Sequence, residues 1–232
     1  MVVPTWGVVE YYGEGLYDRM VRSCHTTCRT ALEKAVTEGL ITTNPAIGCR
    51  LPPKKAKEMP VLTPAEIIRF LTQAKEEGYY EIFLLELTTG MRRGEIIGLK
   101  WRDLDLATGE LHIARQVIRV KSETVVSQPK TKSSIRTVIL APDMVEILAE
   151  LKQMVAGEWM FPSPVNEGQP RNPCALYHRF QTILERAKCK KVRFHDLRHT
   201  FATMAIENGM DIKTLSAMIG HVSAETTLNI YS

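Results

Sequence analysis

The segment 192–232 constrains the fold of this chain most, because a helical pattern there coincides with a cluster of reactive side chains. Apolar residues after His195 recur at the spacing of one helix face: Leu197, Phe201, Met204 and Ala205. This spacing predicts a helix that begins near His195. His195 and Arg198 are three residues apart, so they share a face of that helix.

Two further short helices are expected after this one. Asp211 predicts the N-cap of a helix over 212–219, and Gly220 predicts its end. A last helix is expected over 224–231. Turns between such short helices allow side chains from all three to meet at one site.

Four residues of this segment could act together on a phosphate: His195, Arg198, His221 and Tyr231. A tyrosine hydroxyl, with a reference pKa of about 10, becomes a useful nucleophile when cations stabilise the phenolate and the charge on the attacked atom. Arginine suits a phosphoryl centre because its planar guanidinium donates two parallel hydrogen bonds, and histidine can move protons near neutral pH. The set predicts phosphoryl transfer onto Tyr231.

A zinc site is the alternative interpretation of the two histidines in the first helix. His195 and His199 are four residues apart, which is the spacing of a zinc pair. Arg198 would then lie beside the metal, and no clear third ligand follows. We therefore favour a site without metal.

These residues form a pattern of His-x-x-Arg-His, then Ile-Gly-His, then a tyrosine ten residues after His221. The segment resembles the C-terminal catalytic box of the tyrosine recombinase (phage integrase) family, in which leucine stands in place of Ile219. The resemblance implies that Tyr231 is the nucleophile and that Arg198 holds the phosphate. It also implies that His195 assists proton transfer at the tyrosine and that His221 donates a hydrogen bond to the phosphate.

A second motif lies between residues 81 and 105, where an apolar helix is expected to run into Gly90 and a new helix to begin near Arg92. The sequence Thr-Gly-Met-Arg-Arg-Gly-Glu, followed by Leu-Lys-Trp-Arg-Asp, resembles the first-arginine box of the same family. The resemblance implies that Arg92 is a second catalytic arginine and that Glu95 supports it from one helical turn away. Arg93 competes for this role, but its offset from Gly90 does not match the family pattern.

Between residues 110 and 140 the pattern changes to the alternation typical of strands. A three-stranded antiparallel sheet fits it, with a polar turn over 128–134 before the last strand. The resemblance implies a lysine in this turn that protonates the departing 5′ oxygen of DNA. We assign this general-acid role to Lys130. Lys132, two residues further on, remains an alternative and would otherwise contact a backbone phosphate.

The chain before residue 61 is expected to hold a helical part and a linker. Residues 1–50 resemble the last portion of the family's core-binding domain, which clamps DNA, so a partial domain of this kind is expected there. Residues 51–60 are rich in proline and lysine and predict an extended linker. Three lysines of the linker could touch DNA phosphates, although a solvated charge run fits equally well: Lys54, Lys55 and Lys57.

The expected fold class is α+β and mainly α-helical, with a catalytic domain over 61–232 that carries the small three-stranded sheet. Arg171 and Arg179 lie just before and within a helix expected over 172–187. Their position makes them candidates for DNA contact, and simple surface exposure fits equally well.

Composition constrains the function and location of the protein less than the motifs do. The net charge of +4 fits a nucleic-acid partner without requiring one. The five cysteines form an odd, scattered set that argues against a disulfide framework. No apolar run reaches 18 residues and no signal peptide is evident, so we expect a cytoplasmic location and no membrane partner.

The resemblance implies a site-specific DNA recombinase that cleaves and rejoins double-stranded DNA through a 3′-phosphotyrosine, with neither a metal nor a nucleotide cofactor. It also implies a homotetramer on DNA. Family members usually carry a C-terminal tail that docks on a neighbouring protomer. This sequence stops one residue after Tyr231, which weakens the expectation of a tetramer. Two alternatives remain: a type IB topoisomerase that relaxes DNA as a monomer, and a catalytically silent DNA-binding module.

Overall fold

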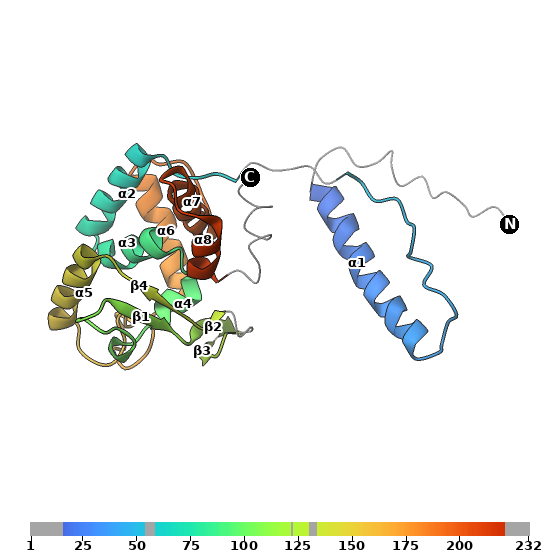
Figure 1. Ribbon diagram of the computed structural model, residues 1–232, viewed down its shortest axis with the longest axis horizontal. Helices are drawn as coiled ribbons and strands as arrows, with labels where there is room; N and C mark the ends of the chain where they lie inside the picture. Colours follow the sequence, from blue (N-terminus) through green and yellow to red (C-terminus); the bar gives the residue numbers. More distant parts are fainter. Residues whose placement is uncertain (1–15, 54–58, 122, 130–133, 221–232) are drawn as a thin grey trace. The chain divides into compact units, whose positions relative to one another are not determined.

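The computed structural model describes residues 16–53, 59–121, 123–129 and 134–220 (Figure 1). The chain divides into two compact units between residues 58 and 59. In the first unit, helix α1 (Leu16–Thr37) is followed by a segment that folds back on it. Asn44 fixes this return, because its buried side-chain amide donates to the carbonyl oxygen of Arg29 at 3.0 Å and to the carboxylate of Glu33 at 2.6 Å.

The second unit is mainly helical, as the sequence predicted. Its helical elements are α2 (Pro64–Glu76), α3 (Tyr80–Thr89), α4 (Arg93–Ile97), the 3₁₀ turn η1 (Trp101–Asp103), α5 (Pro142–Met154), α6 (Pro173–Arg186), α7 (Phe194–Glu207) and α8 (Ile212–Ile219). The start of α2 shows how local sequence sets these bounds. Thr63 and Glu66 each accept the other's backbone N–H through their side chains, at 3.3 and 2.9 Å, directly around Pro64. None of the described helices is long and apolar enough to cross a bilayer.

Four buried phenylalanine rings join the helices at the centre of this unit: Phe70 of α2, Phe83 of α3, Phe180 of α6 and Phe194 of α7. Successive ring centroids lie 5.0, 5.7 and 5.3 Å apart. Contacts of this kind contribute about 0.5–1.5 kcal/mol per pair beyond the burial of area. Because Phe194 is the first residue of α7, this packing fixes where the helix that carries His195 and Arg198 begins.

The predicted small antiparallel sheet content is confirmed, but among the described residues the strands pair as two two-stranded sheets instead of one sheet of three strands. The strands are β1 (Glu110–Ile113) paired with β4 (Arg136–Ile139), and β2 (Gln116–Val120) paired with β3 (Glu123–Ser127). The expected first strand is interrupted at Arg115, whose guanidinium donates to the carboxylate of Asp103 and to the carbonyl oxygen of Gly98. The two halves of the predicted strand pair with different partners, β1 with β4 and β2 with β3.

Candidate active site

Arg92 lies in the turn between α3 and α4, where it is the N-cap residue of α4. The carboxylate of Glu95 holds it twice, accepting its backbone N–H at 3.0 Å and its guanidinium at 2.8 Å. A second guanidinium nitrogen donates to the carbonyl oxygen of Gly220 at 3.1 Å. The Arg92 side chain is still 37% exposed. It is therefore fixed in direction yet open to a ligand.

Glu95 is in turn held by Arg136 of β4, a residue that no motif singled out. The Arg136 guanidinium lies 3.0 Å from the Glu95 carboxylate, and both side chains are buried. Burial alone would raise the pKa of Glu95, but the charge and hydrogen bonds of Arg136, together with those of Arg92, hold this pKa below its ordinary value. Arg136 also donates to the carbonyl oxygen of Met218 at 2.6 Å. One arginine thus ties β4, the Arg92 turn and the end of α8 together.

Arg198 of α7 reaches the same turn. Its side chain is buried, and one guanidinium nitrogen donates to the carbonyl oxygen of Gly90 at 2.9 Å. Gly90 has a left-handed φ of +60°, and a Cβ built on it would lie 2.4 Å from a ring carbon of Phe201. Only glycine meets both demands. The two predicted catalytic arginines therefore meet at one turn: Arg198 binds its first residue, and Arg92 extends from two residues further on.

His195 lies in the first turn of α7, within electrostatic reach of both arginines. Its pKa is lowered from 6.5 to about 4, first by loss of hydration and then by the positive fields of His199, Arg198 and Arg92. The rings of His195 and His199 lie edge to face with centroids 4.9 Å apart. At neutral pH the imidazole of His195 is uncharged and can accept a proton. Among the residues that the structure describes, no group of three or more His, Cys, Asp or Glu side chains could hold a metal ion.

Several predicted site residues lie outside the described residues: Lys54, Lys55, Lys57, Lys130, Lys132, His221 and Tyr231. Described residues near some of these positions in the sequence do contact the candidate site. Gly220, which precedes His221, accepts the hydrogen bond from Arg92, and Arg136 lies in the strand that follows the predicted lysine turn. The assignments of these residues remain predictions.

Arg171 and Arg179 make contacts within the protein near the start of α3. The Arg171 guanidinium lies 4.8 Å from the ring centroid of Tyr79, and its Nε donates to the carbonyl oxygen of Pro162 at 3.2 Å. The guanidinium of Arg179 pairs with Glu77 at 3.2 Å. Their predicted contact with DNA remains a prediction.

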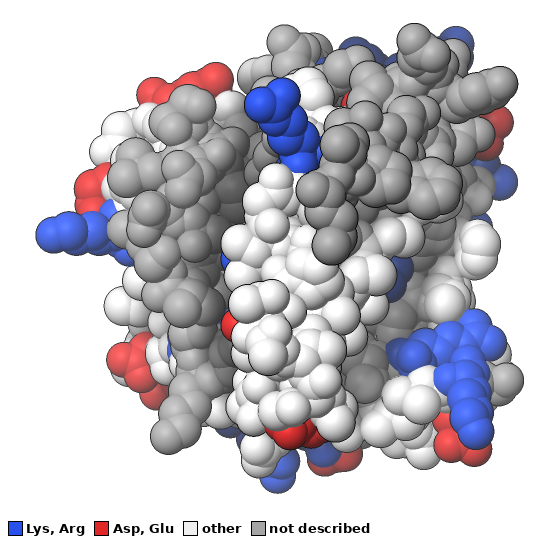
Figure 2. All heavy atoms as spheres, turned by 90° about the vertical axis from the view of Figure 1, so that its right-hand side faces the viewer, with Lys and Arg blue, Asp and Glu red and all other residues white. Residues whose placement is uncertain are grey.

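The net charge of +4 is small for a chain of 232 residues. On the face shown in Figure 2, the described lysine and arginine side chains stand singly or in small groups, among acidic ones. Recognition of a phosphate would then depend on the few arginines that the fold orients.

A mainly helical unit that holds Arg92 and Arg198 around one turn has the architecture of a tyrosine recombinase catalytic domain. Residues 60–232 match the phage integrase family. The chain belongs to this family, the tyrosine recombinases.

Known relatives and structures agree with this assignment. A tyrosine recombinase XerC-like protein of Caldanaerobacter subterraneus is 30% identical over 95% of this chain and 64% of its own length. The ICEBs1 integrase of Bacillus subtilis is 25% identical over 94% of this chain and 62% of its own length. This chain thus spans less than two-thirds of either relative.

Two solved structures share the fold. The Tn1549 transposon integrase, in complex with a circular intermediate DNA, superposes with a TM-score of 0.78 at 20% identity, over 92% of this chain and 75% of that one. A lambda integrase dimer bound to a core site gives a TM-score of 0.66 at 21% identity, over 90% of this chain and 74% of that one.

Proposed function

We propose that this protein is a site-specific DNA recombinase that cleaves and rejoins strands through a 3′-phosphotyrosine on Tyr231. The observation that carries the proposal is the convergence of two cations at one turn: Arg198 donates to Gly90, and Arg92 extends from the same turn. Both charges also lower the pKa of His195. Two guanidinium groups oriented in this way suit the two non-bridging oxygens of one phosphodiester.

The reaction is an in-line displacement at the scissile phosphorus. The phenol oxygen of Tyr231 forms the new P–O bond, and its proton passes to the neutral imidazole of His195. The bond from phosphorus to the 5′ oxygen breaks, and Lys130 donates a proton to that oxygen. Arg92 and Arg198 stabilise the charge on the phosphoryl oxygens while His221 donates a hydrogen bond to them.

Rejoining reverses these steps with a 5′ hydroxyl as the nucleophile. The phosphotyrosine ester retains the energy of the broken phosphodiester, so no nucleotide is consumed. The proposed partner is double-stranded DNA, and the proposed location is the cytoplasm. Among structures that share the fold, a lambda integrase tetramer is bound to a Holliday junction. By analogy we propose that several copies of this protein assemble on DNA.

A suicide substrate tests the proposal. In a DNA duplex with a nick just 3′ of the cleavage point, attack releases a short fragment that carries the new 5′ hydroxyl. This fragment diffuses away, so the covalent complex accumulates and shifts on a denaturing gel. We expect wild-type protein to give this complex and Tyr231→Phe to give none. DNA binding without any complex from the wild type would favour the silent module. Plasmid relaxation without site preference would favour the topoisomerase.

A further inference from the structure

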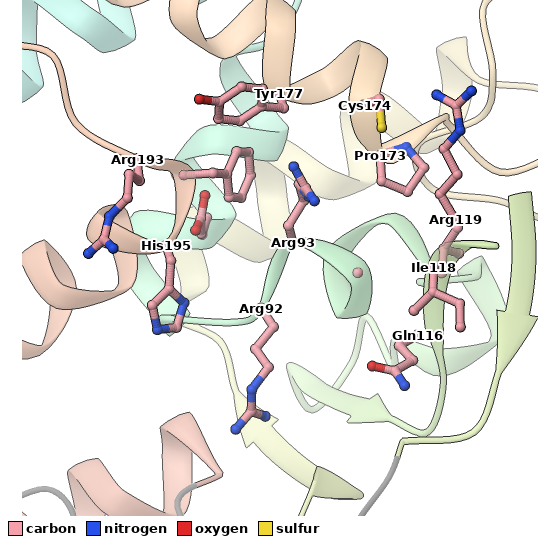
Figure 3. A pocket seen from close by; sticks show the side chains of 14 residues that line it. Arg92, Arg93, Gln116, Ile118, Arg119, Pro173, Cys174, Tyr177, Arg193 and His195 are labelled. Atoms are coloured by element: carbon pink, nitrogen blue, oxygen red, sulfur yellow. The ribbon is translucent and has the colours of Figure 1, made fainter. Parts of the chain in front are cut away.

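A cavity of about 620 Å³ opens beside Arg92 and His195 and extends away from them (Figure 3). It lies between the α4 turn, strand β2 and the first turns of α6 and α7. The proposed chemistry uses only its Arg92 and His195 edge. The other residues that line the cavity have no role in that chemistry and could bind a further group.

Arg93 is the residue that best defines the remainder of the cavity. Its guanidinium lies 5.7 Å from the ring centroid of Phe194 and 5.9 Å from that of Tyr177, so two aromatic rings fix its position. In Figure 3 the side chains of Arg92 and Arg93 point in opposite directions from adjacent positions. Arg92 makes hydrogen bonds to Glu95 and Gly220. Within the described part of the chain, Arg93 has no such acceptor, and its five N–H groups can serve a ligand.

The acidic groups around the cavity do not cancel the charge of Arg93. Glu86 lines it and is 1% exposed, and neither carboxylate oxygen has a hydrogen-bond partner within the described residues. Burial raises the pKa of Glu86 well above its ordinary value, against the smaller opposing effect of Arg198 and Arg93. Burial therefore favours the protonated, uncharged form of this carboxyl group. Asp196, the neighbouring acid in α7, is already paired with Arg193 at 2.7 Å.

Two further features make the cavity electropositive. Arg119 of β2 lines it from the wall formed by that strand, and its Nε makes a weak contact of 3.3 Å with a backbone oxygen. The first residues of α6 and α7 also line the cavity. The N-terminal ends of these two helices, which carry a partial positive charge, thus lie at the cavity wall.

We infer that this cavity binds a second phosphate of the DNA backbone, adjacent to the scissile one, with Arg93 as its main donor and Arg119 as a second. The inference rests on the proposed function, since it takes the substrate to be DNA. It assigns a different task to each member of the Arg92–Arg93 pair: the first acts on the phosphate that reacts, and the second fixes the position of its neighbour. Holding the strand at two phosphates would set the angle at which Tyr231 attacks.

The test removes the charge of one phosphate and of one arginine at a time and measures whether the two effects on affinity are additive. Duplexes carry one uncharged methylphosphonate at successive positions on either side of the scissile phosphate. Their affinity is measured for the wild type, Arg93→Gln, Arg119→Gln and the control Arg102→Gln, which removes an exposed arginine outside the cavity lining. We expect Arg93→Gln to weaken binding to unmodified DNA about 10-fold and to lower the salt slope by about 1.

The decisive result is loss of additivity at one position. At a phosphate next to the scissile one, the methylphosphonate should weaken binding of the wild type and of Arg102→Gln strongly, and binding of Arg93→Gln much less, because only Arg119 would still contact that phosphate. Equal losses at every position in all variants would overturn the inference. A second outcome would also overturn the inference. If an abasic nucleotide, and not a methylphosphonate, abolished the loss of affinity caused by Arg93→Gln, then a base and not a phosphate would occupy the cavity.

Two controls keep the result interpretable. Arg93→Lys retains the charge, so it should retain part of the affinity loss at the methylphosphonate position. Circular dichroism and thermal unfolding of Arg93→Gln check that this variant remains folded. The binding measurement needs no covalent chemistry. A covalent complex on Tyr231 without coupling at any phosphate would overturn this inference alone, whereas coupling without a covalent complex would overturn the proposed reaction alone.

Discussion

The carboxylate of Glu95 and the guanidinium of Arg136 form an ion pair with a separation of 3.0 Å and side chains that are 2% and 7% exposed. The two residues are 41 positions apart in sequence. Because Glu95 also holds Arg92, and Arg136 also holds the carbonyl oxygen of Met218, the pair joins three segments that bear predicted catalytic residues. The geometry of the site therefore depends on a contact that is not itself catalytic.

The first prediction concerns this buried pair. Arg136→Met leaves the Glu95 carboxylate buried without its main partner, which should lower the free energy of unfolding by about 3–5 kcal/mol. Arg186→Met is the control, because its pair with Glu77 at 2.9 Å is on the surface and the arginine is 56% exposed. It should cost about 0–1 kcal/mol. Urea unfolding measures both, and equal losses would contradict the assignment of Arg136.

The second prediction separates two demands on Gly90. Gly90→Ala combines left-handed strain with a contact of 2.4 Å to the ring of Phe201, and should cost about 2–4 kcal/mol. Gly209→Ala is the matched control, since its φ is +84° but nothing lies within 4 Å of the added carbon. It should cost about 1–2 kcal/mol. Similar losses in the two variants would show that α3 and α7 do not approach as closely at Gly90 as described.

The third prediction concerns the protonation of His195. Its pKa is lowered to about 4 in the folded protein, whereas an unfolded histidine titrates near 6.5. The unfolded state therefore binds more protons between these values, and this residue's contribution to stability is lost as the pH falls from 6.5 to 4. NMR titration of DNA-free protein should give a midpoint near 4, which Arg92→Gln should raise and Arg102→Gln should leave unchanged. A midpoint near 6.5 would contradict the described surroundings.

The fourth prediction concerns Glu86. Burial raises its pKa, so the folded protein binds a proton that the unfolded chain releases above its own pKa of about 4.3. The wild type should lose stability relative to Glu86→Gln as the pH rises above that value. The melting temperatures of the two proteins should converge near pH 4 and separate toward pH 8, with the variant higher. Parallel curves over this range would show that Glu86 is ionised in the fold.

Local sequence patterns predicted the helices that carry the candidate site. The features that they did not predict depend on contacts between residues far apart in the sequence. The predicted N-cap Asp211 accepts the N–H groups of Lys213 and Thr214 at 3.0 Å, and Gly220 has the left-handed φ expected of a helix end. The helix predicted to begin near His195 begins at Phe194. Spacing along the chain suffices for these features because the interacting groups are close in sequence.

The missed features all join distant segments. The Arg115–Asp103 pair interrupts the predicted strand, and Arg136 reaches Glu95 across 41 positions. Arg93 was considered only as a rival of Arg92, because neither the rings that position it nor the cavity that it lines is visible in the local sequence. The one signal in the sequence for Arg136 was its position as a charged residue within an otherwise largely apolar strand segment.

The central claim is that a phosphorus atom of DNA becomes bonded to the phenol oxygen of Tyr231. Mass spectrometry of proteolytic peptides from the suicide-substrate complex tests it most directly. The account predicts that the nucleotide is attached by its 3′ phosphate to the peptide containing Tyr231, and that Arg92→Ala and Arg198→Ala each reduce the yield by at least about 100-fold. Attachment at another residue, such as Tyr177 in the cavity wall, or no attached nucleotide at all, would contradict it.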